Sequence, residues 1–447
     1  MIVATSKEGL QEKLDGLNKF AKDKELTVNN KKSQIIIFNK TGRKYKENFT
    51  LNGSKLDVVQ TYTYLGIEMN SCGSFTLAIK ELVSKARKAM IPLYKTIAQF
   101  RIPFIKGLKL FRTYVEPILL YNAENMACFT TKEIEKCKKN AAHIQETVMK
   151  APTTITQLKF YKYILGVGKQ SPNMAVFGEI SEHPLQHKAH LTMLKYWNRI
   201  REMEEDTLVK KAYNENIAHN TPWCQSIQLL NASLNLNNRN PTGTEYDKMA
   251  RNNIRDSFTS HWSQEINKQP PRLKFYAQTK TEFRREKYVE TLPFKDRQRI
   301  SKLLCSTHHL EVEKGRHYNI ERGLRLCKMC TMGAIEDENH FLDVCPAYES
   351  LRSQMISPES GNVSNQLLTQ DPELIAEYVR TAEELRENEL RPWIISNSSL
   401  CSMRLTLSKK ANGTAKAGKP LPLRVTDRTD QGLKFKISRH KRRKTEN

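Results

Sequence analysis

Three cysteines and one histidine lie within nineteen residues of this chain, in the segment CKMCTMGAIEDENHFLDVC from Cys327 to Cys345. The spacing is C-x2-C-x9-H-x4-C, so Cys327 and Cys330 form one pair, and His340 and Cys345 form the other. A backbone that brings two such pairs together supplies four ligands at tetrahedral corners, which is the geometry of structural Zn²⁺ sites. The pattern therefore predicts a small zinc-binding segment with a helix over 321–395.

A chance cluster of buried thiols around a core histidine is the alternative interpretation. Other residues nearby also offer ligand atoms, although their spacing fits no known knuckle: Cys305, His308, His309 and His317. Four protein ligands leave no position for a reactive water, so the predicted ion is structural and not catalytic. Gly333 allows a turn between the two pairs, and EDENHFL predicts the start of a helix that presents His340.

Positive charge dominates the composition. The 447 residues include 73 Lys and Arg against 48 Asp and Glu, which gives a formal net charge of +25. A basic surface attracts phosphate chains and releases their counterions on contact, so RNA or DNA is the first predicted partner. An anionic membrane surface is the second candidate, and a soluble basic protein without such a partner is the alternative.

The sequence predicts an intracellular protein without a membrane partner. No run of about 20 apolar residues is present to span a bilayer, and MIVATSKEGL at the start lacks the basic and apolar regions of a secretory signal. Outside the cluster, the cysteines are scattered as expected for reduced thiols and not for a disulfide framework. They stand at positions 72, 128, 137, 224, 305 and 401.

The first 70 residues predict an α+β fold. Ser6 is a suitable N-cap for an amphipathic helix over 7–22, where leucines recur at helical spacing. Gly53 and Gly66 allow tight backbone geometry within the segments that follow. Strands are predicted for ELTVN, QIIIF, FTLNGSKLDVV and YTYLGIEM, which are rich in β-branched and aromatic residues.

Helical periodicity begins after Ser74, with one apolar stripe over 75–90 and a second over 104–115. We therefore expect helices over 71–150 and a mostly helical region over 151–320. The last segment, 396–447, is predicted to be a basic disordered tail, because residues 401–447 contain 14 Lys and Arg but only 3 Asp and Glu. Its RHKRRK cluster predicts nuclear import and nucleic-acid contacts by Arg439, Lys441, Arg442, Arg443 and Lys444.

Several stretches together resemble non-LTR (LINE-type) retrotransposon reverse transcriptases. LEVEKGRHYNIERGLRLCKMCTMGAIEDENHFLDVCPAYESLR is similar to the cysteine–histidine segment that closes the polyprotein of these elements. TSKEGLQEKLDGLNKFAKDKELTVNNKKSQIIIF resembles the helix and hairpin after the catalytic turn of the palm, and TYTYLGIEM resembles the strand pair that grips the primer end. SFTLAIKELVSKARKAM and LFRTYVEPILLYNAENM are similar to the thumb helices. The likeness covers most of residues 1–390 in the expected order.

This resemblance implies roles for particular residues. It makes 1–70 the distal part of a polymerase palm and 71–150 a thumb. Lys32 aligns with a lysine that assists pyrophosphate departure, and a primer grip is implied for Tyr64, Leu65 and Gly66. At YNAEN, Asn122 stands where the family usually has glycine, which puts the local turn in question.

One element of the family pattern is missing from the sequence. Family polymerases hold two Mg²⁺ ions with a Tyr-x-Asp-Asp turn, but no YxDD or FxDD occurs among the 447 residues, and Met1 already aligns with the strand after that turn. We therefore expect a truncated reverse transcriptase that has no catalytic residues of its own and retains nucleic-acid binding; Mg²⁺ would serve only an intact polymerase. The alternative is a host-retained nuclear, zinc-containing nucleic-acid-binding protein.

Overall fold

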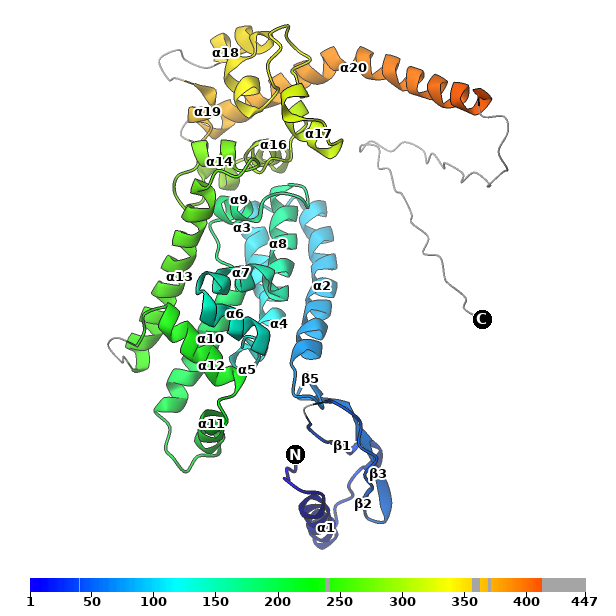
Figure 1. The fold of residues 1–447 in the computed structure, drawn as a ribbon, viewed down its shortest axis with the longest axis vertical. Helices are drawn as coiled ribbons and strands as arrows, with labels where there is room; N and C mark the ends of the chain where they lie inside the picture. The colour runs from blue at the N-terminus through cyan, green and yellow to red at the C-terminus, as the bar shows by residue number, and fades with distance from the viewer. Residues whose placement is uncertain (40, 238–241, 356–361, 369–370, 412–447) are drawn as a thin grey trace. The chain divides into compact units, whose positions relative to one another are not determined.

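A computed structural model describes the chain apart from residues 40, 238–241, 356–361, 369–370 and 412–447. The chain divides into two units, Met1–Glu387 and Asn388–Asn447. The last helix of the first unit continues into the second. The described residues are mostly helical, with a small sheet portion near the N-terminus (Figure 1).

The N-terminal part contains one helix and five short strands. α1 (Lys7–Asp23) begins after Ser6, whose side chain accepts a hydrogen bond from the Gly9 amide, so the predicted helix and cap are confirmed. Leu14 of α1 packs against residues of the sheet in one small core. The strands are β1 (Gln34–Ile36), β2 (Phe49–Leu51), β3 (Ser54–Val59), β4 (Thr61–Tyr64) and β5 (Ile67–Asn70).

Strand pairing follows two patterns. The first three strands form a sheet in the order β1-β3-β2, in which β1 runs parallel to β3 and β2 runs antiparallel to it. β4 and β5 form a separate antiparallel hairpin, with Tyr64 opposite Ile67. The predicted α+β character of this part is confirmed, whereas its assignment to a polymerase palm remains a prediction.

Three of the strand predictions are wrong in detail. ELTVN forms no strand: it is irregular, and Asn30–Lys32 is a 3-10 turn capped by the side chain of Asn29, which accepts from the Lys32 amide at 3.2 Å. FTLNGSKLDVV and YTYLGIEM are each a hairpin, not a single strand. Their turn residues all have positive φ, at Asn52 (50°), Gly53 (73°), Leu65 (49°) and Gly66 (81°). Such two-residue turns match the twist of antiparallel strands.

Helices make up the rest of the described fold (Figure 1). Both predicted apolar stripes are confirmed, because Leu82 and Met90 of one and Phe104 and Phe111 of the other are buried. The helices are α2 (Thr76–Gln99), α3 (Phe104–Tyr114), α4 (Glu116–Leu119), α5 (Ala123–Met126), α6 (Thr131–Lys139), α7 (Ala142–Lys150), α8 (Pro152–Leu165), α9 (Asn173–Ile180), α10 (Leu185–Arg201), α11 (Leu208–Ala218), α12 (Pro222–Ser233), α13 (Gly243–Asn267), α14 (Lys274–Thr279), α15 (Lys287–Thr291), α16 (Phe294–Leu304), α17 (Glu311–His317), α18 (Glu349–Met355), α19 (Val363–Gln366) and α20 (Pro372–Ala411).

α13 connects the two main hydrophobic cores. Every fourth residue on one of its faces is buried. Tyr246 and Ile254 belong to a core shared with α6, α10 and α12, whereas Phe258 and Trp262 belong to a larger core shared with α2, α8, α9 and α16. This i, i+4 repetition gives one continuous apolar stripe on a helix of 25 residues. The long helix therefore holds both halves of the helical region together.

The C-terminal segment differs from its prediction. The tail expected to be disordered begins at 396, but α20 continues to Ala411. Leu400, Met403 and Leu407 recur at helical spacing, whereas most of the basic residues behind the disorder prediction come later. Residues 412–447, with the five predicted basic contacts of RHKRRK, lie outside the described residues. None of the described helices has the length and apolarity needed to cross a membrane.

Candidate metal centre and nucleic-acid interface

The first ligand pair sits on a tight reversal of the chain. The Cys327 amide donates to the Ala334 carbonyl at 2.8 Å, and Leu326 and Ile335 form an isolated antiparallel bridge. Gly333 allows this reversal with a φ of 64°, as its position between the two ligand pairs predicts. This reversal places Cys327 and Cys330 close to His340 and Cys345.

The second pair is presented by a short helical turn. Helical backbone begins at Glu338, and His340–Val344 forms a π-helical turn in which the Cys345 amide donates to the His340 carbonyl at 2.8 Å. The side chain of Asp337 accepts from the His340 amide at 3.1 Å and so satisfies an amide at the start of this turn. The predicted helix start at EDENHFL is confirmed.

The four predicted ligands come together in space. Their ligand atoms all lie within 4.8 Å of one another, with 3.9 Å between the Sγ atoms of Cys327 and Cys345 and 3.4 Å between Cys330 Sγ and His340 Nε2. Metal–ligand bonds of zinc at tetrahedral angles correspond to separations of about 3.8 Å for two sulfurs and about 3.6 Å for sulfur and nitrogen. The group could therefore hold a tetrahedral metal ion.

Burial determines the protonation of these ligands. It raises the pKa of Cys327 to about 12, raises the pKa of Cys345 and lowers the pKa of His340. All three shifts favour uncharged groups. A neutral imidazole is already in the form that binds metal, whereas the thiols need a cation nearby before they ionise. A divalent ion would supply that compensating charge.

The other ligand candidates lie elsewhere. Among the described residues, no further cysteine, histidine or carboxylate joins the group of four. Cys305 is fully buried in the helical core, where its pKa is raised by burial and by the charge of Glu179. His308 Nε2 lies 2.8 Å from Glu338 Oε1 and so supports the turn that carries His340. The set predicted from the spacing is the set that the structure brings together.

A buried ion pair attaches this segment to α20, and sequence reasoning did not identify it. Nε and Nη2 of Arg386 each lie 2.7 Å from a different carboxylate oxygen of Glu336, and the two residues are 5% and 1% exposed. Glu336 also accepts from the Glu311 amide at 2.8 Å, and Tyr378 of α20 donates to the Leu342 carbonyl at 3.0 Å. In the sequence, this pair could have been inferred from the position of Arg386. It follows Ala382, a buried residue of the helix, by four residues and therefore lies on the same face.

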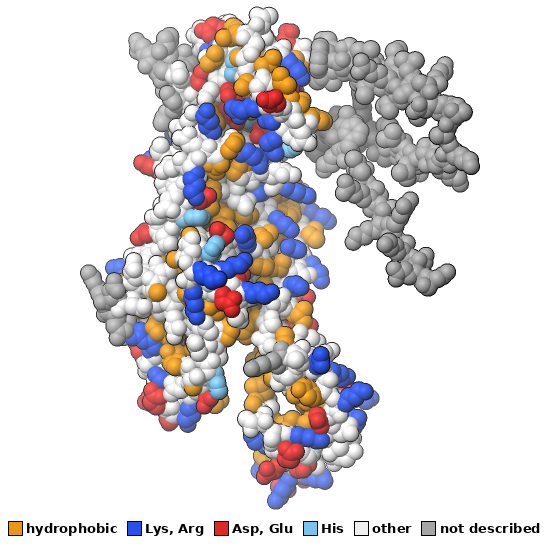
Figure 2. Space-filling model, in the orientation of Figure 1, with side chains coloured by type: hydrophobic (Ala, Val, Ile, Leu, Met, Phe, Trp, Pro, Cys, Tyr) orange, Lys and Arg blue, Asp and Glu red, His pale blue; other side chains and the backbone are white. Residues whose placement is uncertain are grey.

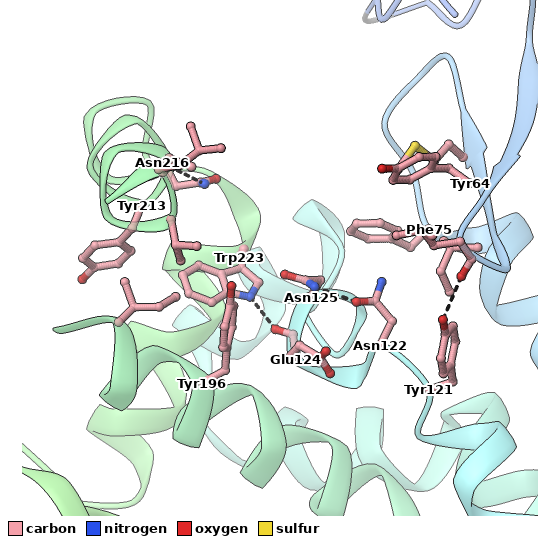
Figure 3. Close-up of a pocket in the computed structure, with 17 residues that line it drawn as sticks. Tyr64, Phe75, Tyr121, Asn122, Glu124, Asn125, Tyr196, Tyr213, Asn216 and Trp223 are labelled. Carbon is pink, nitrogen blue, oxygen red and sulfur yellow. Dashed lines mark hydrogen bonds between the residues drawn. The ribbon is translucent and has the colours of Figure 1, made fainter. Parts of the chain in front are cut away.

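The residues aligned with a primer grip form the tip of the β4–β5 hairpin. Leu65 is 73% exposed, and its carbonyl accepts a hydrogen bond of 2.7 Å from the hydroxyl of Tyr121 (Figure 3). This contact anchors the hairpin to the helical region. Lys32 is exposed in the turn before β1. Asn122 has a φ of 55°, a left-handed conformation that asparagine tolerates better than most residues, so it can stand where glycine is usual in the family.

A row of cations runs along α2. Five basic side chains are exposed on the helix, and none of them lies in an ion pair with a carboxylate of the described residues: Lys80, Lys85, Arg87, Lys88 and Lys95. Figure 2 shows Lys and Arg side chains gathered over this part of the molecule. At 1.5 Å per residue, the row from Lys80 to Lys95 is about 22 Å long. Its length and charge suit contact with several consecutive phosphates.

Comparisons with known proteins do not identify a family. A scan against protein-family models finds no match, and a search of curated proteins finds no similar sequence. The resemblance to non-LTR reverse transcriptases therefore remains a prediction from the residues themselves.

Proposed function

We propose that this chain is a partial reverse transcriptase of the non-LTR type that binds RNA and DNA largely without regard to sequence. The observation that carries the proposal is the cationic row on α2. Like charges on one helix face repel one another, and none of the five cations lies in an ion pair with a carboxylate of the described residues; Glu81, four residues before Lys85, is the one acidic residue of α2. A phosphate backbone would supply the missing charge and gain affinity by releasing counterions.

The β4–β5 hairpin supports the same function. Leu65 has a φ of 49° and is 73% exposed, although a bulky residue in this conformation costs about 1–2 kcal/mol. Strain of this kind at an exposed apolar tip favours a contact role over a packing role. The hairpin leads directly into α2, so a strand held by the row would pass close to Tyr64, Leu65 and Gly66.

The ion proposed for the cysteine–histidine group is structural Zn²⁺. Three thiols and one imidazole match its preference for sulfur and nitrogen, and four ligands close its coordination shell. In this role the ion holds the segment after α17 against the helical core. We propose no catalytic role for this ion.

Binding without polymerisation is proposed for these 447 residues alone. Nucleotidyl transfer in similar enzymes needs two metal ions held by paired aspartates, and the sequence contains no such pair. A host-retained nuclear protein would use the same binding surfaces. The two cases differ in whether the RHKRRK cluster directs the chain to the nucleus, which a fluorescent fusion with and without 439–444 distinguishes.

A charge-reversal experiment tests the proposed binding surface. The variant K80E/R87E/K95E changes the row on α2, and the matched control K248E/K287E/K295E makes the same change in net charge at exposed lysines of other helices. Affinity for a labelled 20-nucleotide RNA and for a DNA duplex is measured by fluorescence anisotropy over a range of salt concentrations.

The two variants should behave differently. Each lost phosphate contact lowers the slope of log K against log salt by about 0.7–0.9, so the α2 variant should lose about 2–3 from the slope. The control should change affinity much less at moderate salt. Equal effects of the two variants would show that only net charge matters and that α2 is not the binding surface.

A further inference from the structure

A groove of about 690 Å³ lies between the β4–β5 hairpin and the helices α5, α10, α11 and α12. Its volume is within the usual range for ligand pockets. Figure 3 shows aromatic rings on two facing walls, one from the hairpin side and one from the helices. The six rings belong to Tyr64, Phe75, Tyr121, Tyr196, Tyr213 and Trp223.

The helical wall is held in place by its own contacts. Trp223 Nε1 donates to the Glu124 carbonyl at 2.9 Å. Tyr196 and Tyr213 meet the Trp223 ring nearly edge-on, at centroid distances of 6.4 and 6.2 Å. Trp197 Nε1 donates to the Tyr213 hydroxyl at 3.0 Å, which leaves the proton of that hydroxyl available. The rings are therefore preorganised, and they still line open space.

Between the aromatic walls lie amide groups and a single carboxylate. Asn122, Glu124 and Asn125 line the groove between the two walls, and Asn216 lies near Tyr213 (Figure 3). No lysine or arginine is among the described residues that line it. A phosphate would meet no counter-charge inside and would be repelled by Glu124. The lining instead suits a planar, uncharged group that stacks on rings and exchanges hydrogen bonds with amides.

We propose that this groove accepts unpaired bases of a single nucleic-acid strand. The inference rests on the proposed function, because the strand that supplies the bases is held by the cationic row. Aromatic faces bind any base by stacking, with about 1–3 kcal/mol per base, and side-chain amides can pair with exposed base edges. The site would give the chain a preference for single strands and loops over duplexes.

Cations stand at the border of the groove, where the backbone of such a strand would run. Arg199 is exposed, and its guanidinium lies over the ring of Tyr196 at 5.3 Å from the centroid. Phe75 lines the groove directly before α2, and Lys80 follows in the early turns of that helix. These charges favour an arrangement in which the bases lie inside the groove and the phosphates lie outside it.

An apolar helix from another protein fits the groove less well. Asn125 Nδ2 already donates to Asn122 Oδ1 at 2.6 Å, but such a helix would still cover the Glu124 carboxylate and the remaining amide groups without offering them hydrogen bonds. Each unpaired buried polar group costs about 1–3 kcal/mol. Bases satisfy the same groups through their edges. The aliphatic part of the lining, at Leu208 and Val209, contacts ring faces and sugars equally well.

The test compares three labelled probes of equal length with the full chain. They are a 20-nucleotide single-stranded DNA, its duplex, and an abasic 20-mer that keeps every phosphate but carries no bases. The variant Y196L/Y213L removes two stacking faces, and Y196F/Y213F restores them. Tyr318, which is 79% exposed and lies at the end of α17, gives the matched control Y318L.

The wild-type chain should bind the single strand at least tenfold more tightly than the abasic strand. Y196L/Y213L should reduce that preference at least fivefold while leaving abasic binding unchanged, and Y196F/Y213F and Y318L should keep it. Equal affinity of the wild-type chain for both strands would overturn the inference, and so would an unchanged preference in Y196L/Y213L. K80E/R87E/K95E reports separately on phosphate binding: loss of affinity for all three probes supports the proposed function whatever the groove variants show.

Discussion

Removing the charge of Arg386 should destabilise the metal segment strongly. Arg386 and Glu336 are almost fully buried and make two hydrogen bonds of 2.7 Å to each other. Burial opposes the charge of Arg386, but its bonds to Glu336 outweigh this and raise its pKa. Breaking a buried pair by removing one partner costs about 3–5 kcal/mol, because the other charge remains buried without compensation.

The substitution R386M keeps an unbranched, shorter side chain and removes the guanidinium with its charge. The carboxylate of Glu336 would then keep its hydrogen bond from the Glu311 amide but lose both bonds from Arg386. The second variant, R386M/E336Q, removes both charges but keeps an acceptor for that amide. It should therefore be more stable than R386M alone by about 1–3 kcal/mol. R380M on the same helix is the control, because Arg380 is 40% exposed and its ion pairs are of the weak surface kind.

Hydrogen exchange followed by mass spectrometry gives a local measurement of this effect. The amides to follow are those of Cys327, Glu336 and Cys345, which are hydrogen-bonded within the segment. A loss of 3–5 kcal/mol corresponds to exchange about 100-fold to several thousandfold faster. The reasoning is refuted if R386M changes these amides no more than R380M, or if R386M/E336Q exchanges as fast as R386M.

Four further expectations concern other parts of the chain. Metal analysis should find one zinc per chain, and C330S should lower this ratio whereas C72S, at an exposed cysteine, should not; a ratio near zero for the unmodified chain contradicts the zinc assignment. Burial lowers the pKa of His190 to about 4, so the unfolded state binds the proton first, and His190 alone should reduce unfolding free energy by about 2 kcal/mol between pH 7.5 and pH 5. Urea unfolding of H190Q should show a smaller pH effect than that of the unmodified chain or of H219Q. G178A should cost about 1–3 kcal/mol in the same assay, because a Cβ at this buried glycine would lie 2.2 Å from the Tyr276 hydroxyl oxygen and 2.9 Å from Trp262 Nε1; a stability gain would mean that the two rings yield easily. Primer extension on an RNA template with Mg²⁺ should give no product with these 447 residues, and robust incorporation by the pure chain would refute the resemblance or the missing catalytic pair.

The sequence alone predicts those features that depend on neighbouring residues. The four candidate metal ligands lie within nineteen residues, and their spacing leaves few ways to bring them together. The apolar stripes of α2 and α3 are equally local. ELTVN shows the limit of this approach, because its β-branched residues favour a strand, yet the side chain of Asn29 caps a 3-10 turn just after it. Short strands depend on a pairing partner, which sequence periodicity does not reveal.

Features that join distant segments were out of reach of sequence reasoning. Fifty residues separate Glu336 from Arg386, and each looks like an ordinary surface charge in the sequence. The groove is similar, because its hairpin wall comes from residues near 65 and its helical wall from residues near 196–223. From the sequence alone, the tyrosines and tryptophan of those helices would be assigned to the core. Only the fold shows that their rings face open space.

The metal segment shares its hydrophobic core with the cationic helix. Cys327 and Cys345 belong to the same core cluster as Val83 and Met90 of α2. Removal of an ion from the group would therefore disturb the core cluster to which these residues of α2 also belong, although none of the four candidate ligands needs to touch nucleic acid. A C345S variant that binds RNA poorly would consequently say nothing about contact by the metal segment. Only variants of residues outside the core, such as the exposed Lys80 and the half-buried Tyr196, can separate contact from folding in this chain.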